Sequence, residues 1–86
     1  MKIIIEPHTL KRALERGAAE EEIIEVINKG IEINVKKGRL AKGKIFNFNS
    51  SWNNKFYEQK RIEVIYTIEN EIIVTITVYV FYGKWE

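Results

Sequence analysis

Apolar residues recur along this chain with two different periods, and the period changes at Gly30. Before Gly30 they recur every three or four positions, which is typical of amphipathic helices; after it they recur at every second position, which is typical of half-buried strands. A short Ile-rich run at residues 2–6 precedes the helical part and predicts one additional strand. The chain is therefore expected to start with a strand and helices and to finish in a β-rich region.

The helical part divides into two helices at Gly17. The first is expected to start at Pro7, which suits the first helical turn, and to end at Arg16, because Gly17 favours the left-handed conformation that ends helices. The second is expected over residues 20–29, with glutamates 20–22 at its positive end and Gly30 after it. The faces expected to dock on the sheet consist of Leu10, Ala13 and Leu14 in the first helix and of Ile23, Ile24, Val26 and Ile27 in the second.

The β-rich part is expected to contain strands at residues 31–35 and 46–49, a mobile connection at residues 36–44, a turn at residues 52–55 and a hairpin over residues 61–83. In the hairpin, a three-residue turn at residues 69–71 pairs Val64 with Ile76 and buries a continuous apolar face, whereas a two-residue turn would pair Val64 with Thr75. The three-residue turn is therefore predicted. It places Ile73, Thr75, Thr77, Tyr79 and Phe81 together on the opposite, partly polar face.

This order of elements predicts an α+β fold in which two N-terminal helices pack on an antiparallel β-meander of about four to five strands. The 86 residues suffice for one core, so residues 1–86 are expected to form a single domain. The run of three Ile near the N-terminus is too short for a signal peptide or a membrane span, which favours a cytoplasmic protein. Heavy use of Ile, Glu and Lys without Asp resembles the bias of hyperthermophile proteins.

Composition argues against several kinds of site. The chain has no Cys and no Asp and a single His, so neither a disulfide nor a metal site is expected. No glycine-rich nucleotide-binding pattern occurs, so no cofactor is expected.

Positive charge is concentrated in the middle of the chain. Residues 29–61 carry nine basic and two acidic side chains, a net charge of +7, whereas the segments before and after carry −2 and −3. Such a segment suits contacts with nucleic-acid phosphates, and RNA is the expected partner; a merely solvated connection is the alternative. The candidate binding residues are Lys36, Lys37, Arg39, Lys42 and Lys44. The nearby Trp52, Phe56 and Tyr57 either stack unpaired bases or belong to the core.

His8, Arg12 and Arg16 follow one another at intervals of four and form a cationic stripe on the first helix. Metal-free RNA cleavage needs a base for the ribose hydroxyl, cations for the charge on the phosphorane and an acid for the leaving oxygen. A neutral imidazole accepts a proton, so His8 is the candidate base and the two arginines are candidate phosphate clamps. A solvated helix face would have the same pattern.

Residues 8–30, HTLKRALERGAAEEEIIEVINKG, resemble the signature of the domain of unknown function 4258 family. That signature has a His, an Arg four residues on, then Arg-Gly, an acidic helix and a β-meander ending in a Thr-containing strand; here these are His8, Arg12, Arg16, Gly17 and residues 20–27 and 74–80. The family is similar to the RelE and colicin-type ribonuclease toxins. The resemblance implies that the stripe faces phosphate, with Thr77 or Tyr79 beside it on the sheet, and that an antitoxin protein is a further partner.

The function predicted from these features is a small, toxin-like, metal-independent ribonuclease. One alternative is a nucleic-acid-binding module without chemistry. Another is a homo-oligomeric or protein-interaction domain, in which residues 74–86 form an apolar edge strand that pairs with a second copy or another protein.

Overall fold

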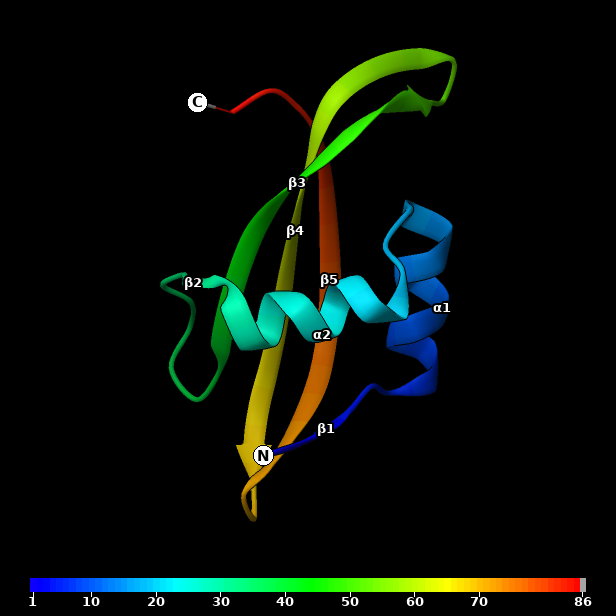
Figure 1. Cartoon of the computed structure of the whole chain (residues 1–86). Coiled ribbons are helices and arrows are strands. Elements are labelled where there is room, and N and C mark those ends of the chain that lie inside the picture. The colour runs from blue at the N-terminus through cyan, green and yellow to red at the C-terminus, as the bar shows by residue number, and fades with distance from the viewer. Residues whose placement is uncertain (86) are drawn as a thin grey trace.

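The computed structural model describes residues 1–85, which form two helices and five strands (Figure 1). The elements are β1 Lys2–Ile4, α1 Pro7–Arg16, α2 Glu20–Lys29, β2 Ile31–Glu32, β3 Leu40–Trp52, β4 Lys55–Glu69 and β5 Ile72–Gly83. The α+β class with two helices ahead of the main strands is confirmed. The sheet order is β1-β5-β4-β3-β2, and it is mixed, because β1 runs parallel to β5 while the other pairs are antiparallel.

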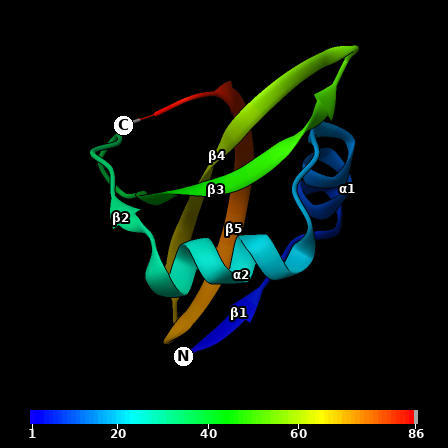
Figure 2. The same ribbon diagram turned by 45° about the horizontal axis from the view of Figure 1, so that its top comes forward.

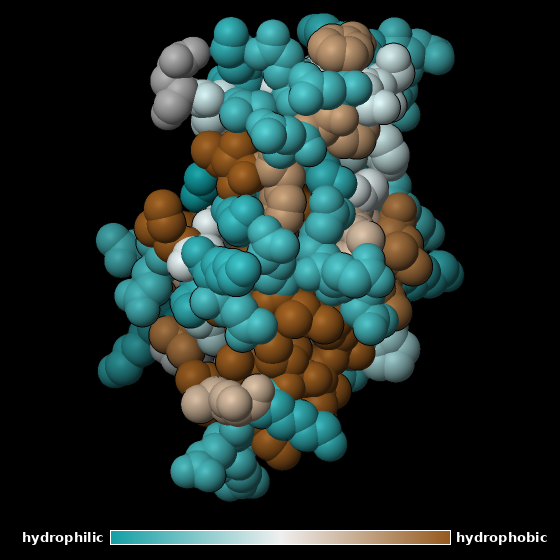
Figure 3. Space-filling view, viewed as in Figure 1, coloured by the Kyte–Doolittle hydropathy of each residue, from teal (hydrophilic) through white to brown (hydrophobic). Residues whose placement is uncertain are grey.

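The two helices lie differently on this sheet. In both ribbon views α2 runs across the strands, whereas α1 lies beside the β5 edge (Figures 1 and 2). Apolar residues of α2 pack with those of β4 and β5 to form the core, which includes Ile23, Val26, Ile27, Ile62, Val64, Ile73 and Val78. In the space-filling view of this side, apolar atoms show through between the polar surface of α2 and the N-terminal region (Figure 3). The opposite side of β4 and β5 is called the open face here; its residues include Arg61, Glu63, Ile65, Thr77, Tyr79 and Phe81.

The junction between the helices is held by a buried lysine. Lys60, on β4, is 6% exposed, and its ammonium donates to the carbonyl of Gly17 at 2.7 Å and to the Glu22 carboxylate at 2.9 Å. The same carboxylate accepts the N–H of Ala19 at 2.9 Å, which satisfies one free donor at the start of α2. Lys60 therefore fixes the end of α1 and the start of α2 to the middle of the sheet.

Leu14 was predicted to belong to the face by which the first helix docks on the sheet, and this prediction is wrong. Leu14 is 58% exposed, whereas Thr9 and Ala13 are buried. The reason is that α1 packs against the edge of β5 instead of lying flat on the sheet, so the helix is turned toward Thr9. For the second helix, Ile23, Val26 and Ile27 are buried as predicted, and Ile24 is half-buried.

The predicted hairpin register is also wrong. Asn70 and Glu71 form a two-residue turn with left-handed φ values of 52° and 65°, and Glu69 pairs with Ile72. Ile76 is then left over as a β-bulge, beyond which Val64 pairs with Val78, which neither predicted register contained. The extra residue reverses the sides of the strand, so Ile73 and Thr75 are buried under the helices. From the predicted mixed face, only Thr77, Tyr79 and Phe81 remain on the open face.

The segment around the basic loop differs from its prediction as well. β2 has two residues instead of five, and β3 starts at Leu40, so residues 40–44 are strand and not a mobile connection. The predicted turn between Trp52 and Lys55 is confirmed, with Asn53 and Asn54 at positive φ. β5 is not a free edge over residues 72–78, because β1 and α1 cover it there. Neither helix has the length and apolar character needed to cross a membrane.

Two glycines at positive φ offer a matched test of how the α1 end is packed. A Cβ at Gly17 would collide with the Tyr82 hydroxyl and press on the Trp52 ring, whereas a Cβ at Gly38 would meet nothing within 4 Å. Gly38→Ala is expected to lower the free energy of unfolding by roughly 1–2 kcal/mol, the cost of the left-handed backbone alone. Gly17→Ala is expected to cost roughly 1–3 kcal/mol more because of overpacking. Urea unfolding measures both, and equal losses would contradict the packing.

Candidate nucleic-acid interface

One boundary of the candidate site is the contact between α1 and the outer edge of β5, which we call the seam. β1 pairs with β5 only over residues 72–74, so the carbonyls of Ile76 and Val78 lie beyond the paired part of that edge. The Thr9 hydroxyl donates to the Ile76 carbonyl at 3.2 Å, and Arg16 Nη1 donates to the Val78 carbonyl at 2.7 Å. Side chains of a helix thus take the place of a neighbouring strand, which satisfies acceptors that would otherwise need water.

The same contact brings Arg16 to Tyr79 on the open face. The guanidinium carbon lies 5.8 Å from the centroid of the Tyr79 ring, within cation–π range. Tyr82 donates its hydroxyl hydrogen to the Arg16 carbonyl at 2.6 Å; burial, aided by the negative charge of Glu22, raises the pKa of Tyr82, so the phenol keeps its proton. Arginine carries five N–H donors, so the bond to Val78 leaves others for a phosphate.

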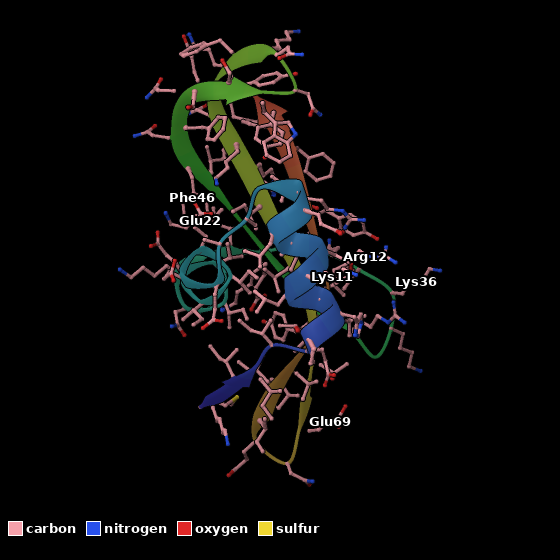
Figure 4. All side chains as sticks on the ribbon, turned by 90° about the vertical axis from the view of Figure 1, so that its right-hand side faces the viewer. Lys11, Arg12, Glu22, Lys36, Phe46 and Glu69 are labelled. Carbon is pink, nitrogen blue, oxygen red and sulfur yellow. The ribbon has the colours of Figure 1, made fainter. Side chains whose placement is uncertain are left out.

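From the other edge of the sheet, residues 33–39 fold toward the open face. A turn closes this loop, with the N–H of Arg39 donating to the Lys36 carbonyl at 3.2 Å. Between the loop and the strands is an open-face hollow of about 330 Å³, lined by Val35, Lys36, Arg39, Ile65 and Tyr79. Figure 4 shows Arg12 of α1 and Lys36 of the loop on the same side of the sheet, away from α2. Cations therefore flank the hollow from both edges.

The charge on the open face is positive at its rim. Within the face, Arg61 Nε donates to Glu63 at 2.9 Å, so these two charges offset each other. Glu63 lies opposite Tyr79 in the paired strands. Because the Arg61 guanidinium offsets the charge of Glu63, this carboxylate repels an anion near the Tyr79 ring less strongly. In the described part of the chain, no ion pair holds Lys36, Lys37 or Arg39. These loop cations are therefore available to a ligand.

Two of the five predicted basic residues lie elsewhere. Lys42 donates to the Ile27 carbonyl at the end of α2 at 2.9 Å, and Lys44 pairs with Glu25 of α2 at 2.7 Å. The Lys44 hydrogen bond lowers the pKa of the Glu25 carboxyl. Both lysines belong to the helix side of β3 and hold α2, because alternate residues of a strand point to opposite sides.

The predicted catalytic residues are brought together only in part. Arg16 and Tyr79 are in contact, and Thr77 is half-buried on the same face, one strand position from the bulge. His8 and Arg12 are exposed on α1, and Figure 4 shows Arg12 directed to the open-face side. His8 makes no hydrogen bond or ion pair within the described residues.

The aromatic residues near the central lysines divide into two groups. Trp52 stacks on Tyr82 at 5.1 Å, and Tyr57 lies 5.4 Å from the same ring, so both serve packing. Phe56 is 60% exposed. The sequence interpretation put Phe81 on the same strand face as Thr77 and Tyr79 without naming it as a site residue, and it missed Val35. Phe81 follows Tyr79 by two positions, and that spacing was the available signal.

Comparison with protein-family models, with curated proteins and with solved structures finds no match to this chain. The resemblance to the domain of unknown function 4258 family therefore stays a prediction. Among residues 1–85, no group of three or more His, Cys, Asp or Glu side chains is arranged to hold a metal ion.

Arg16 has a structural role that Arg12 lacks, and stability measurements separate the two. Arg16→Ala is expected to lower the free energy of unfolding by about 2 kcal/mol, because it removes a charged donor from the Val78 carbonyl. Arg12→Ala, an exposed position on the same stripe, is expected to change it by about 0.5 kcal/mol or less. Urea unfolding followed by circular dichroism measures both values. Similar losses in the two variants would show that the seam does not hold α1.

Proposed function

We propose that this chain binds RNA on its open face. The observation that carries the proposal is the open-face hollow, where Lys36 and Arg39 of the loop and Tyr79 of β5 line one concave surface. Loop cations without an ion pair supply phosphate contacts at little cost, because no existing pair has to be broken. Arg16 and Arg12 extend the same positive rim along the other edge.

Two further points favour a polyanion over a small ligand. The cations come from two segments on opposite edges of the sheet, so a ligand with several phosphates makes more contacts here than a ligand with one. The acidic residues of α2, Glu20, Glu21 and Glu22, lie in a helix on the other side of the sheet and do not oppose an anion here. The resemblance of residues 8–30 to a ribonuclease-like family favours RNA over DNA.

Binding is tested with a charge-matched pair of double variants. Lys36→Gln/Arg39→Gln removes two loop cations, and Lys2→Gln/Lys29→Gln removes two exposed cations outside the site. For a labelled RNA 12-mer, the slope of log K against log salt is expected to fall by about 1.4 in the loop variant, or roughly 0.7 per phosphate contact. The control is expected to keep the wild-type slope.

Either of two results would contradict the proposed RNA binding. An affinity of wild-type protein that does not change with salt, or an identical loss in both double variants, would remove phosphate contact at the hollow as the basis of binding. Fluorescence anisotropy at three or four salt concentrations gives the slopes.

We propose metal-independent cleavage of the bound RNA as a second function, favoured by the contact between Arg16 and Tyr79. In this reaction His8 takes the proton of a ribose 2′-hydroxyl, whose oxygen attacks the adjacent phosphorus. Arg12 and Arg16 stabilise the charge on the phosphorane, and the departing 5′-oxygen takes a proton from an acid as its bond to phosphorus breaks. Thr77 and Tyr79 both lie on the open face, which the RNA strand crosses in this proposal.

Cleavage is tested with labelled RNA in the presence of a chelator. His8→Ala and Arg12→Ala are expected to slow the reaction roughly 100-fold, the usual contribution of a general base or a charge-stabilising group. Lys11→Ala, an exposed cation on the same helix but outside the stripe, is the control and is expected to cut at the wild-type rate. RNA that stays intact with the wild-type protein after prolonged incubation leaves binding as the function.

A further inference from the structure

We infer that the open face takes unpaired RNA bases, which stack on Tyr79 and Phe81. This inference rests on the proposed RNA binding and states which form of RNA the site accepts. It starts from the exposure of two aromatic rings on consecutive outward positions of one strand: Tyr79 is 43% and Phe81 is 47% exposed. Neighbouring exposed aromatic rings form a contiguous apolar patch, and such patches mark surfaces that bind a ligand or a partner.

The β-bulge explains why these two rings stand together. Ile76 is the extra residue of β5, and beyond it Tyr79 pairs with Glu63 and Phe81 with Arg61, both on the open face. Without the bulge, the alternation of β5 would direct Val78 and Val80 to the open face and the two rings toward the helices. The single inserted residue therefore places both aromatic side chains on the surface.

The spacing of the rings suits a strand whose bases are not stacked on one another. The Tyr79 and Phe81 centroids are 6.5 Å apart with an interplanar angle of 32°. This is nearly twice the spacing of about 3.4 Å between successive bases on one strand of a duplex. Two consecutive bases can therefore contact the two rings only if the strand is extended and unpaired at this point. Bases in a duplex keep their faces inside the stack and cannot reach either ring.

The charged side chains around the Tyr79 ring determine which face of the ring a base can stack on. Arg16 lies over one face of the Tyr79 ring, which leaves the other face for a base. The hollow beside that ring is lined by Lys36 and Arg39, whose cations reach the phosphates on either side of the stacked base. Val35 and Ile65 add apolar surface beside the ring, on which the face of a base can pack. Phosphates and bases thus meet complementary groups in one place.

The test compares a 12-nucleotide single-stranded RNA with a duplex of the same length by fluorescence anisotropy at fixed salt. Wild-type protein is expected to bind the single strand at least about tenfold more tightly, and Tyr79→Ala and Phe81→Ala are each expected to weaken that binding about tenfold, since stacking contributes this much per base. Duplex binding is expected to stay at its wild-type value in both variants. Tyr79→Phe keeps the ring and is expected to bind like wild type.

Phe56→Ala is the matched control. Phe56 is 60% exposed, but it lies at the β3–β4 hairpin end, five positions along β4 from Arg61, the residue opposite Phe81, which is roughly 17 Å along the strand. It is expected to leave single-strand binding unchanged. Thermal unfolding of each variant checks that the fold is intact; if Tyr79→Ala is unstable, Phe81→Ala tests base stacking by itself.

Failure of this inference is distinguishable from failure of the proposed function. Salt-dependent binding with equal affinity for single strand and duplex, and with no loss in the two alanine variants, overturns base stacking and leaves RNA binding standing. No salt-dependent binding of either RNA overturns both. A self-association of the free protein that Phe81→Ala abolishes, again without RNA binding, assigns the open face to a second copy of this chain and overturns both as well.

Discussion

The seam between α1 and the outer edge of β5 determines where almost everything else in the molecule lies. A strand edge with free carbonyls invites pairing with another chain, and here the Thr9 hydroxyl and the Arg16 guanidinium occupy the acceptors of Ile76 and Val78. To reach them, the helix has to lie beside the sheet, which exposes Leu14 to solvent. Because Arg16 is held at this edge, its guanidinium also lies over Tyr79. Protection of the edge and construction of the candidate site therefore use the same side chain.

The bulge at Ile76 connects this seam to the two faces of the sheet. Before it, Thr75 is buried and accepts the backbone N–H of Glu6 at 3.1 Å, which attaches the start of α1 to β5. After it, Tyr79 and Phe81 point away from the helices. An extra residue in one strand thus lets β5 bury its first half for the core and present aromatic rings from its second half, while β5 stays paired with β4 on both sides of the bulge.

Periodicity and end signals were sufficient to predict the fold class, both helices and their ends, because Pro7, Gly17 and Gly30 act through local backbone preferences. The register of β5 was not predictable in this way. A choice based on a continuous apolar face assumed regular alternation, and the bulge breaks that alternation to satisfy contacts from Thr9 and Glu6, which are more than sixty residues away in sequence. The site was predicted in the same partial manner. Charge pointed to Lys36 and Arg39 of the loop, but equally to Lys42 and Lys44, which lie on the helix side of β3 and hold α2.

A chain of this size cannot cover both faces of its sheet. Each helix has ten residues, about 15 Å of length, against a molecule that extends 42 Å along its longest axis, and α1 is already used at the edge. One face is therefore left open, with Ile65, Tyr79 and Phe81 on it, and apolar surface of this kind promotes self-association. The cations of the loop and of α1 oppose that association, because two copies meeting through their open faces would bring like charges together. The same positive rim attracts a polyanion, so the charge pattern that keeps this face from pairing with itself also selects the ligand that we propose for it.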